Sequence, residues 1–162
     1  MIFIDNFIDR IGKFTSYLVL ILAILVVYDS LNRYLFSGGN VALQELEWHL
    51  FDMIFLLGLS YALNSDDHVR VDIFYSRYTN KTKAIVNLIS LIFLILPFVA
   101  IILYTSSNFI YLSFLQGEIS SDPGGLCCRY VIKGFIFIGF ALLGVQSISN
   151  IVKNFHMIRG DK

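Results

Sequence analysis

Four long apolar stretches divide this chain, and they limit its fold more than any other feature of the sequence. Each is close to or longer than the roughly 20 residues that a helix needs to cross about 30 Å of hydrocarbon. An isolated strand would leave its backbone groups unpaired in lipid, so each stretch is predicted to be a helix. The predicted membrane-spanning segments are residues 14–36, 48–63, 84–115 and 130–152.

The composition also indicates a membrane protein. Hydrophobic residues make up 57% and charged residues 15% of the 162 residues, and the mean hydropathy is +0.73. Soluble domains carry roughly 25% charged residues, and one small core cannot bury this much apolar surface. The net charge is zero, so the chain has no general attraction to nucleic acid. We predict an all-α integral membrane protein whose residues 1–162 form a single four-helix domain.

The first apolar stretch is predicted to be a retained span and not a cleaved signal peptide. Its apolar core is long for a signal peptide, and residues 29–33 offer no pair of small residues for cleavage. The third stretch holds 32 residues, which would reach about 48 Å as a helix. It must therefore tilt or bend, and Pro97 near its middle is the expected bend point.

Basic residues are distributed unequally between the predicted loops, and this predicts the orientation. Nine of the twelve lie before the first span, between the second and third, or after the fourth. Both termini and the central loop are therefore predicted to be cytoplasmic. The nine are Arg10, Lys13, Arg70, Arg77, Lys81, Lys83, Lys153, Arg159 and Lys162, and the other three are Arg33, Arg129 and Lys133.

Charged residues near the end of the first span need an explanation, because charges close to lipid are costly. Asp29 and Arg33 stand four residues apart, so they share one helix face, with the acid before the base in the favourable order. Two interpretations are open. The pair lies at the membrane interface and reaches toward water, or Arg33 extends to another helix or subunit.

The entry to the second span is crowded with polar residues. Spacings of four and three place Glu45, His49 and Asp52 on one helix face, and Trp48 is typical of an anchor at the membrane interface. Two carboxylates and a histidine can ligate a metal, but no thiolate or second histidine accompanies them. We therefore favour a polar face docked on protein over a metal site, with Glu45 as a partner for Arg33.

The predicted cytoplasmic loop carries the basic residues Arg77, Lys81 and Lys83 where it enters the third span. They are predicted to rest on anionic lipid head groups. In the fourth span, Gly134, Gly139 and Gly144 alternate with bulky residues, as expected where helices approach closely.

Several short motifs along the chain form a recognisable series. They are Arg33-Tyr34 at the end of the first span, Glu45-Leu46 before the second, Phe55, Gly58 and Ala62 within it, and His68-Val69-Arg70-Val71-Asp72 after it. In this order they resemble the small membrane subunit of TRAP (tripartite ATP-independent periplasmic) transporters, the DctQ-like family. The resemblance covers essentially the whole chain.

The resemblance implies a sodium symporter that imports an organic acid across the bacterial inner membrane by secondary active transport. A large multi-span subunit would hold the substrate and sodium sites, and a periplasmic solute-binding protein would deliver the solute. This chain would be the scaffold, neither an enzyme nor the holder of a cofactor. The residues predicted to make subunit contacts or to serve structure are Arg33, Glu45, Trp48, Asp52, Gly58, His68 and Asp72.

Two functions of other classes remain as alternatives. One is a self-contained small channel or exporter, although no span carries a polar stripe that would line a pore. The other is a four-helix membrane thiol oxidoreductase that uses Cys127 and Cys128. Such enzymes need a separated reactive pair and usually a second pair, whereas this chain has two adjacent cysteines, which are predicted to be free thiols.

Overall fold

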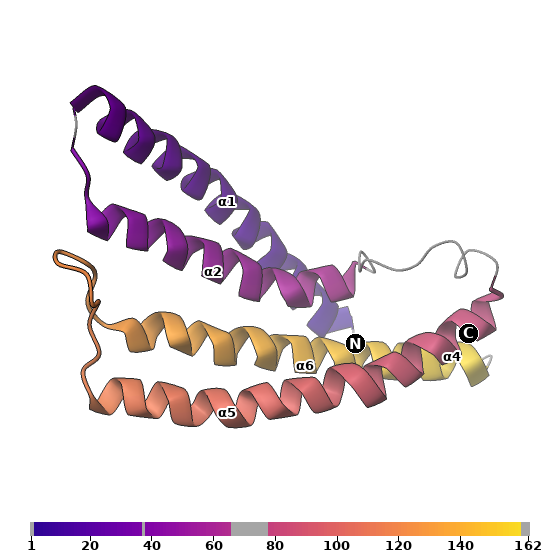
Figure 1. Ribbon diagram of the computed structural model, residues 1–162. Helices are drawn as coiled ribbons and strands as arrows, with labels where there is room; N and C mark the ends of the chain where they lie inside the picture. The colour runs from indigo at the N-terminus through magenta and orange to yellow at the C-terminus, as the bar shows by residue number, and fades with distance from the viewer. Residues whose placement is uncertain (1, 37, 66–77, 160–162) are drawn as a thin grey trace.

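The fold is helical throughout the part of the chain that the computed structural model describes, namely residues 2–36, 38–65 and 78–159 (Figure 1). These residues include no strand. Four helices are long and apolar enough to cross a membrane. The predicted all-α architecture with four spans is therefore confirmed.

Every long helix continues beyond its apolar stretch into polar sequence. The helical segments are α1 (Ile2–Phe36), α2 (Val41–Asn64), α4 (Asn80–Ser90), the π-helical turn η1 (Leu91–Ile95), α5 (Leu96–Leu115) and α6 (Arg129–Arg159). The segments α4, η1 and α5 follow one another without a break and form the third long helix. The end of the molecule where α1 finishes and α2 begins is called the outer end, and the opposite one the inner end, after the predicted orientation.

The helices form an open row and not a closed bundle. Along the row α1 packs on α2, α2 packs on α6, and α6 packs on α4 and α5. Toward the outer end α1 diverges from its neighbours (Figure 1). Only 11–22% of the most apolar window of each spanning helix is buried within the chain. Most of the apolar surface is therefore left for lipid or for another protein.

Glycines allow the closest approaches between helices. A Cβ atom on Gly139 of α6 would lie 2.8 Å from the backbone oxygen of Leu56 in α2. A Cβ atom on Gly12 of α1 would lie 2.2 Å from the ring of Tyr61. By contrast, Gly134 has no atom of another segment within 4 Å. Of the three glycines predicted to mark close approaches, Gly139 and Gly144 do so within the chain and Gly134 does not.

The buried apolar core lies where α2, the third long helix and α6 meet. It consists of Leu63, Leu91, Val99 and Leu143. Phe98 and Phe140 pack edge to face beside it, with ring centroids 5.7 Å apart. This core is small because a row of four helices buries only narrow strips of each one.

The third long helix changes its geometry just before Pro97, as predicted. Proline has no N–H to donate, and its ring collides with the carbonyl four residues earlier. The turn that precedes it is π-helical, and the N–H of Leu96 donates to the oxygen of Leu91, five residues back. The wider turn absorbs the mismatch, and α4 is not collinear with α5 in Figure 1.

Candidate functional site

Glu45 is the centre of a polar cluster at the outer end. It lies in the second turn of α2, which begins after Asn40, whose side chain accepts a hydrogen bond from the N–H of Ala42. The Glu45 carboxylate accepts hydrogen bonds from the hydroxyl of Ser120, from the backbone N–H of Leu126 at 2.5 Å and from Arg129 at 3.0 Å. One side chain therefore joins α2 to the outer loop 116–128 and to the start of α6.

The outer loop is shaped to close over Glu45. The N–H of Gly125 donates to the oxygen of Asp122 at 3.0 Å, and Gly124 has a left-handed φ of 83°. A Cβ atom on Gly125 would lie 2.4 Å from the hydroxyl oxygen of Ser120 and 2.7 Å from the Glu45 carboxylate. A larger residue there would displace Ser120 or Glu45, so glycine in the Asp-Pro-Gly-Gly turn lets the loop backbone come within reach of the acid.

A second ion pair fixes the other side of this loop. Lys133 of α6 donates to Glu118 and lies 3.9 Å from the centroid of the Phe109 ring. The hydrogen bond from Lys133 helps to hold the pKa of Glu118 below its usual value. Together the two ion pairs make the outer loop a brace between α2, α5 and α6.

The predicted pairing of Arg33 with Glu45 is wrong in this structure. Arg33 pairs instead with Asp29, four residues earlier on the same helix, and Glu45 pairs with Arg129. The physical reason is geometry. The divergence of α1 separates Arg33 from the cluster, while the outer loop delivers Arg129 to Glu45.

Asp29 is fully buried although it belongs to a spanning helix, while the Arg33 side chain is 45% exposed. One oxygen of Asp29 accepts from Arg33, and the other has no hydrogen-bond partner among the described residues. A buried oxygen of Glu47 likewise has none there. The described part of the chain therefore leaves one carboxylate oxygen of each acid without a hydrogen bond.

A cleft opens between the outer halves of α2 and α6. It has a volume of about 390 Å³, and its walls include Glu45, Trp48, His49, Asp52 and Lys133. Trp48 is 69% exposed, which fits its predicted place at a membrane interface. Among the described residues no group of three or more His, Cys, Asp or Glu side chains is arranged to hold a metal ion.

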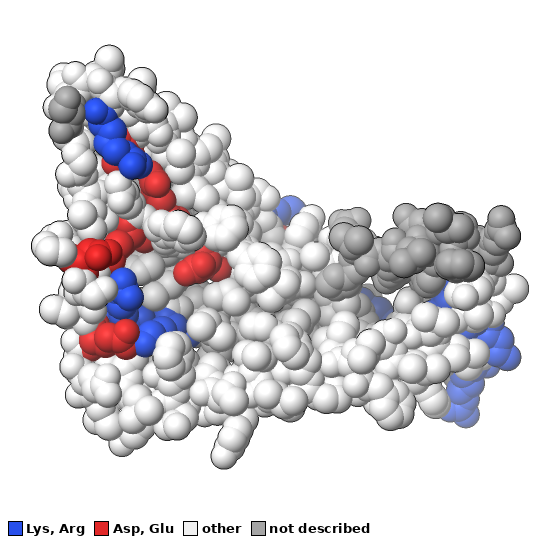
Figure 2. Space-filling model, viewed as in Figure 1, with Lys and Arg blue, Asp and Glu red and all other residues white. Residues whose placement is uncertain are grey.

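Figure 2 shows that charged side chains of both signs gather at the outer end, whereas the surface over the middle of α5 and α6 carries none on the face in view.

Gly58 has no atom of another segment within 4 Å, so its surface is open for a partner. Lys81 is exposed at the start of α4. The predicted site residues His68, Asp72 and Arg77 lie outside the described residues.

The adjacent cysteines are free thiols, as predicted. Their sulfur atoms are 3.1 Å apart, and Cys128 has a left-handed φ of 63°. Cys128 raises the pKa of the Cys127 thiol through a hydrogen bond. A raised pKa lowers the fraction of reactive thiolate, and the sequence contains no second pair to relay electrons.

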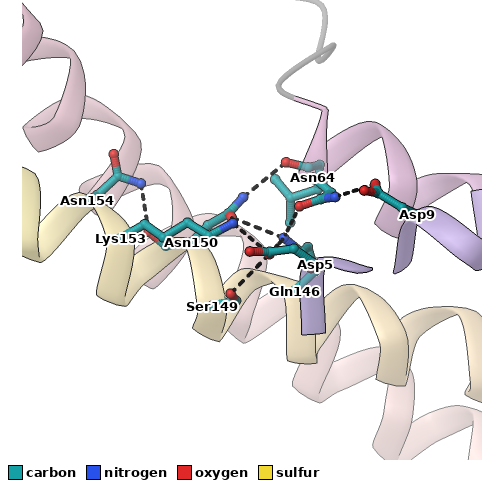
Figure 3. A network of polar contacts seen from close by, with 9 residues as sticks. Asp5, Asp9, Asn64, Gln146, Ser149, Asn150, Lys153 and Asn154 are labelled. Carbon is teal, nitrogen blue, oxygen red and sulfur yellow. Dashed lines mark hydrogen bonds and ion pairs between the residues drawn. The ribbon is translucent and has the colours of Figure 1, made fainter. Parts of the chain in front are cut away.

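A polar network at the inner end was not predicted from the sequence (Figure 3). At its centre is Gln146 of α6, which is fully buried. Its amide nitrogen lies 2.8 Å from the side-chain oxygen of Asn64 in α2 and 3.2 Å from that of Asp5 in α1. Lys153 donates to the same Asp5 oxygen at 2.6 Å. The network therefore joins three helices.

Further hydrogen bonds extend this inner network. Asn64 donates to Asp9 at 2.8 Å, and Asn150 donates to the backbone oxygen of Leu63 at 3.0 Å. A signal for the network exists in the sequence. Gln146, Asn150 and Lys153 stand four and three residues apart, so they share one face at the end of the fourth span.

Comparison with known proteins gives one family. A family model described as the DctQ component of tripartite ATP-independent periplasmic transporters matches residues 22–157. The matched region contains the outer cluster, the cleft and the α6 part of the inner network. No curated protein sequence matches the chain.

Proposed function

Because this chain belongs to the DctQ family, the small membrane components of TRAP transporters, we propose that it is the scaffold subunit of a sodium-coupled transporter that imports an organic anion. The members of this family are transporter components, and the family is not a family of enzymes. Its partners would be a large multi-span membrane subunit and a periplasmic solute-binding protein. Its place would be the bacterial inner membrane, which agrees with four helices able to span a bilayer.

The observation that best supports a scaffold is the apolar packing between the helices. A coupled transporter needs a polar site deep in the membrane that differs between two states. Here the cluster packed between the helices is apolar and consists of Leu63, Leu91, Val99 and Leu143. The buried hydroxyls of Ser60 and Ser147 are bonded to the backbone of their own helices. The polar networks lie at the outer and inner ends. Such a chain is suited to hold a moving partner in place and not to pass a solute itself.

The exposed apolar surface supports a protein partner. An open row of helices presents two broad faces, and large side chains such as Phe93, Tyr104 and Phe114 are more than half exposed. Lipid can cover part of this surface. The polar groups of the outer end, however, are better satisfied by protein than by lipid. The alternatives of a small channel or a thiol oxidoreductase gain no support from the described residues.

Copurification tests this proposal. An affinity tag on the chain should recover the large membrane subunit in near-equimolar amount from mild detergent, because the two would share an extensive apolar interface. An unrelated four-helix membrane protein with the same tag serves as the control. Recovery of this chain alone, under conditions in which the large subunit is abundant, would argue for a self-contained channel or exporter.

The orientation is a separate prediction. Reporter fusions after Lys162 and within residues 64–83 should report the cytoplasm, and fusions near Gly39 and Gly124 the periplasm, because nine of twelve basic residues lie on the predicted cytoplasmic side. Fusions of an alkaline phosphatase and of a fluorescent protein at the same sites provide opposite signals. A periplasmic C-terminus would show that the orientation is inverted.

A further inference from the structure

Asp52 is a polar side chain of a spanning helix that contacts within this chain do not explain. It is exposed on α2, a spanning helix, and it has no hydrogen bond or ion pair with any described residue. Its neighbours on the same helix, Phe51 and Phe55, are 53% and 58% exposed and apolar. An unpaired carboxylate among such residues needs a partner from outside the chain.

The position of Asp52 along α2 also argues for a partner from outside the chain. α2 has 24 residues and is about 36 Å long, and Asp52 lies about 17 Å along it from Val41. The hydrocarbon core of a bilayer is about 30 Å thick. Trp48 is predicted to lie at the membrane interface, so Asp52 lies one turn, about 6 Å, further into the predicted span. Ionised side chains within a span are costly and nearly always face protein or a water-filled cavity.

The shape of the surface shows where a partner would fit. Asp52 lines the polar cleft of about 390 Å³ and also a deeper hollow of about 230 Å³, whose walls include Phe55, Leu56, Ile132 and Ile136. The two adjoin, because Lys133 lines both as well. Together they make a groove along α2 and α6, polar toward the outer end and apolar toward the middle, which is called the α2–α6 groove.

The lysine in this groove does not neutralise Asp52. The ammonium of Lys133 is bonded to Glu118 and lies over the Phe109 ring, 3.9 Å from its centroid. Arg129, the other basic residue of the groove, is bonded to Glu45. Both cations are thus already paired, and the carboxylates of Asp52 and Asp122 in the groove have no ion pair with a described residue.

We propose that the α2–α6 groove is the seat of a membrane helix of the large subunit, and that a Lys or Arg side chain of this helix pairs with Asp52. The inference rests on the proposed function, which supplies the large subunit. An apolar helix fills the deeper hollow, and a basic side chain on it supplies the charge that the groove lacks. The pair forms only on assembly, which makes Asp52 a determinant of partner choice.

The test uses the full chain, tagged and coexpressed with the large subunit. Asp52→Lys should lower the recovered large subunit at least about tenfold, because it sets two cations together in a low-dielectric interface. Asp52→Asn, which removes the charge and keeps the size, should give a smaller loss. Gln116→Lys adds a positive charge at an exposed position of the outer end that lines neither hollow, and it should recover the large subunit as the unmodified chain does.

Two further measurements separate assembly from folding. Since Asp52 makes no hydrogen bond or ion pair with a described residue, Asp52→Asn should leave the thermal unfolding of the isolated chain in detergent unchanged or raise its midpoint. A photo-crosslinking residue in place of Phe55 should link to the large subunit. Replacing in turn each Lys and Arg in the spans of the large subunit by Glu should find one change that restores assembly with Asp52→Lys.

The outcomes distinguish the two proposals. If the unmodified chain recovers the large subunit and both Asp52 variants do so equally well, the groove assignment is wrong and the scaffold function stands. A cross-link from position 55 only to lipid or to a second copy of this chain likewise overturns the groove assignment. If the unmodified chain recovers no large subunit, both proposals fail.

Discussion

Proteoliposomes that contain this chain alone will show no solute uptake under an imposed sodium gradient. Vesicles that contain this chain and the large membrane subunit, with the matching binding protein added outside, will accumulate the solute, and omission of any one component will reduce uptake to background. The physical reason is that sodium coupling requires a site whose affinity differs between two conformations. The cluster packed between the helices, around Val99 and Leu143, is apolar, and the buried hydroxyl of Ser147 beside it is bonded to the backbone of its own helix.

The measurement is uptake of a radiolabelled organic anion, with equal sodium on both sides of the membrane as the control. Two results would contradict the scaffold function. One is gradient-driven uptake by the isolated chain, which would make it a transporter in its own right. The other is full uptake by the large subunit and the binding protein without this chain, which would leave it no necessary part in transport.

Replacing Gly139 by leucine should be the most damaging single change to the fold of the isolated chain. A Cβ atom there already lies 2.8 Å from the backbone oxygen of Leu56, so the branched side chain forces α2 and α6 apart. Overpacking of this kind typically costs about 1–3 kcal/mol. The loss should be at or above the upper part of that range, because backbone, unlike a flexible side chain, cannot move aside locally.

Gly134→Leu provides the matched control for this change. Gly134 is on the same helix and has no atom of another segment within 4 Å, so an added side chain meets open space. Thermal unfolding of the two variants in the same detergent compares them directly. Equal midpoints for Gly139→Leu, Gly134→Leu and the unmodified chain would mean that α2 and α6 do not approach as closely as the structure has them.

The helical architecture could be predicted because lipid leaves a spanning segment few alternatives. Hydropathy alone marks the four apolar stretches, and Pro97 marks the altered turn of the third. The polar extensions of the helices could not be predicted in this way. The part of α1 before residue 14 is held by contacts with distant segments, such as that of Gly12 with Tyr61, and these leave no signal in local hydropathy.

Only part of the outer cluster was predicted: Glu45 was expected to make contacts, whereas Ser120 and Arg129 were not expected as its partners. Glu45 and Arg129 are both placed at the outer end by the predicted topology, but 84 residues separate them along the chain. Which base reaches Glu45 depends on the close packing of Gly125 and on the divergence of α1. Helix spacing correctly brings Asp29 and Arg33 together, since that pair needs only one turn of one helix.

For the inner network, the sequence does contain the spacing that places Gln146, Asn150 and Lys153 on one helix face. The fold is needed to show which residues of other helices they bind. A glutamine and an asparagine near the end of a span are common enough to be read as polar edge residues. Their structural role follows only from the fold, in which Asn64 and Asp5 both accept hydrogen bonds from Gln146. The subunit contacts predicted for Gly58, His68 and Asp72 and the lipid contacts predicted for Arg77, Lys81 and Lys83 stay predictions.

The bond between Asp5 and Lys153 also bears on how the protein is made. The two residues are 148 positions apart, and the other side chains bonded to Asp5, Gln146 and Ser149, come almost as late. During synthesis the ribosome releases the start of α1 long before it releases these partners. Asp5 therefore lacks these three partners until α6 has been made. Insertion of α6 then brings these partners to Asp5, so the start of α1 forms its bonds to α6 much later than its contacts with α2 can form.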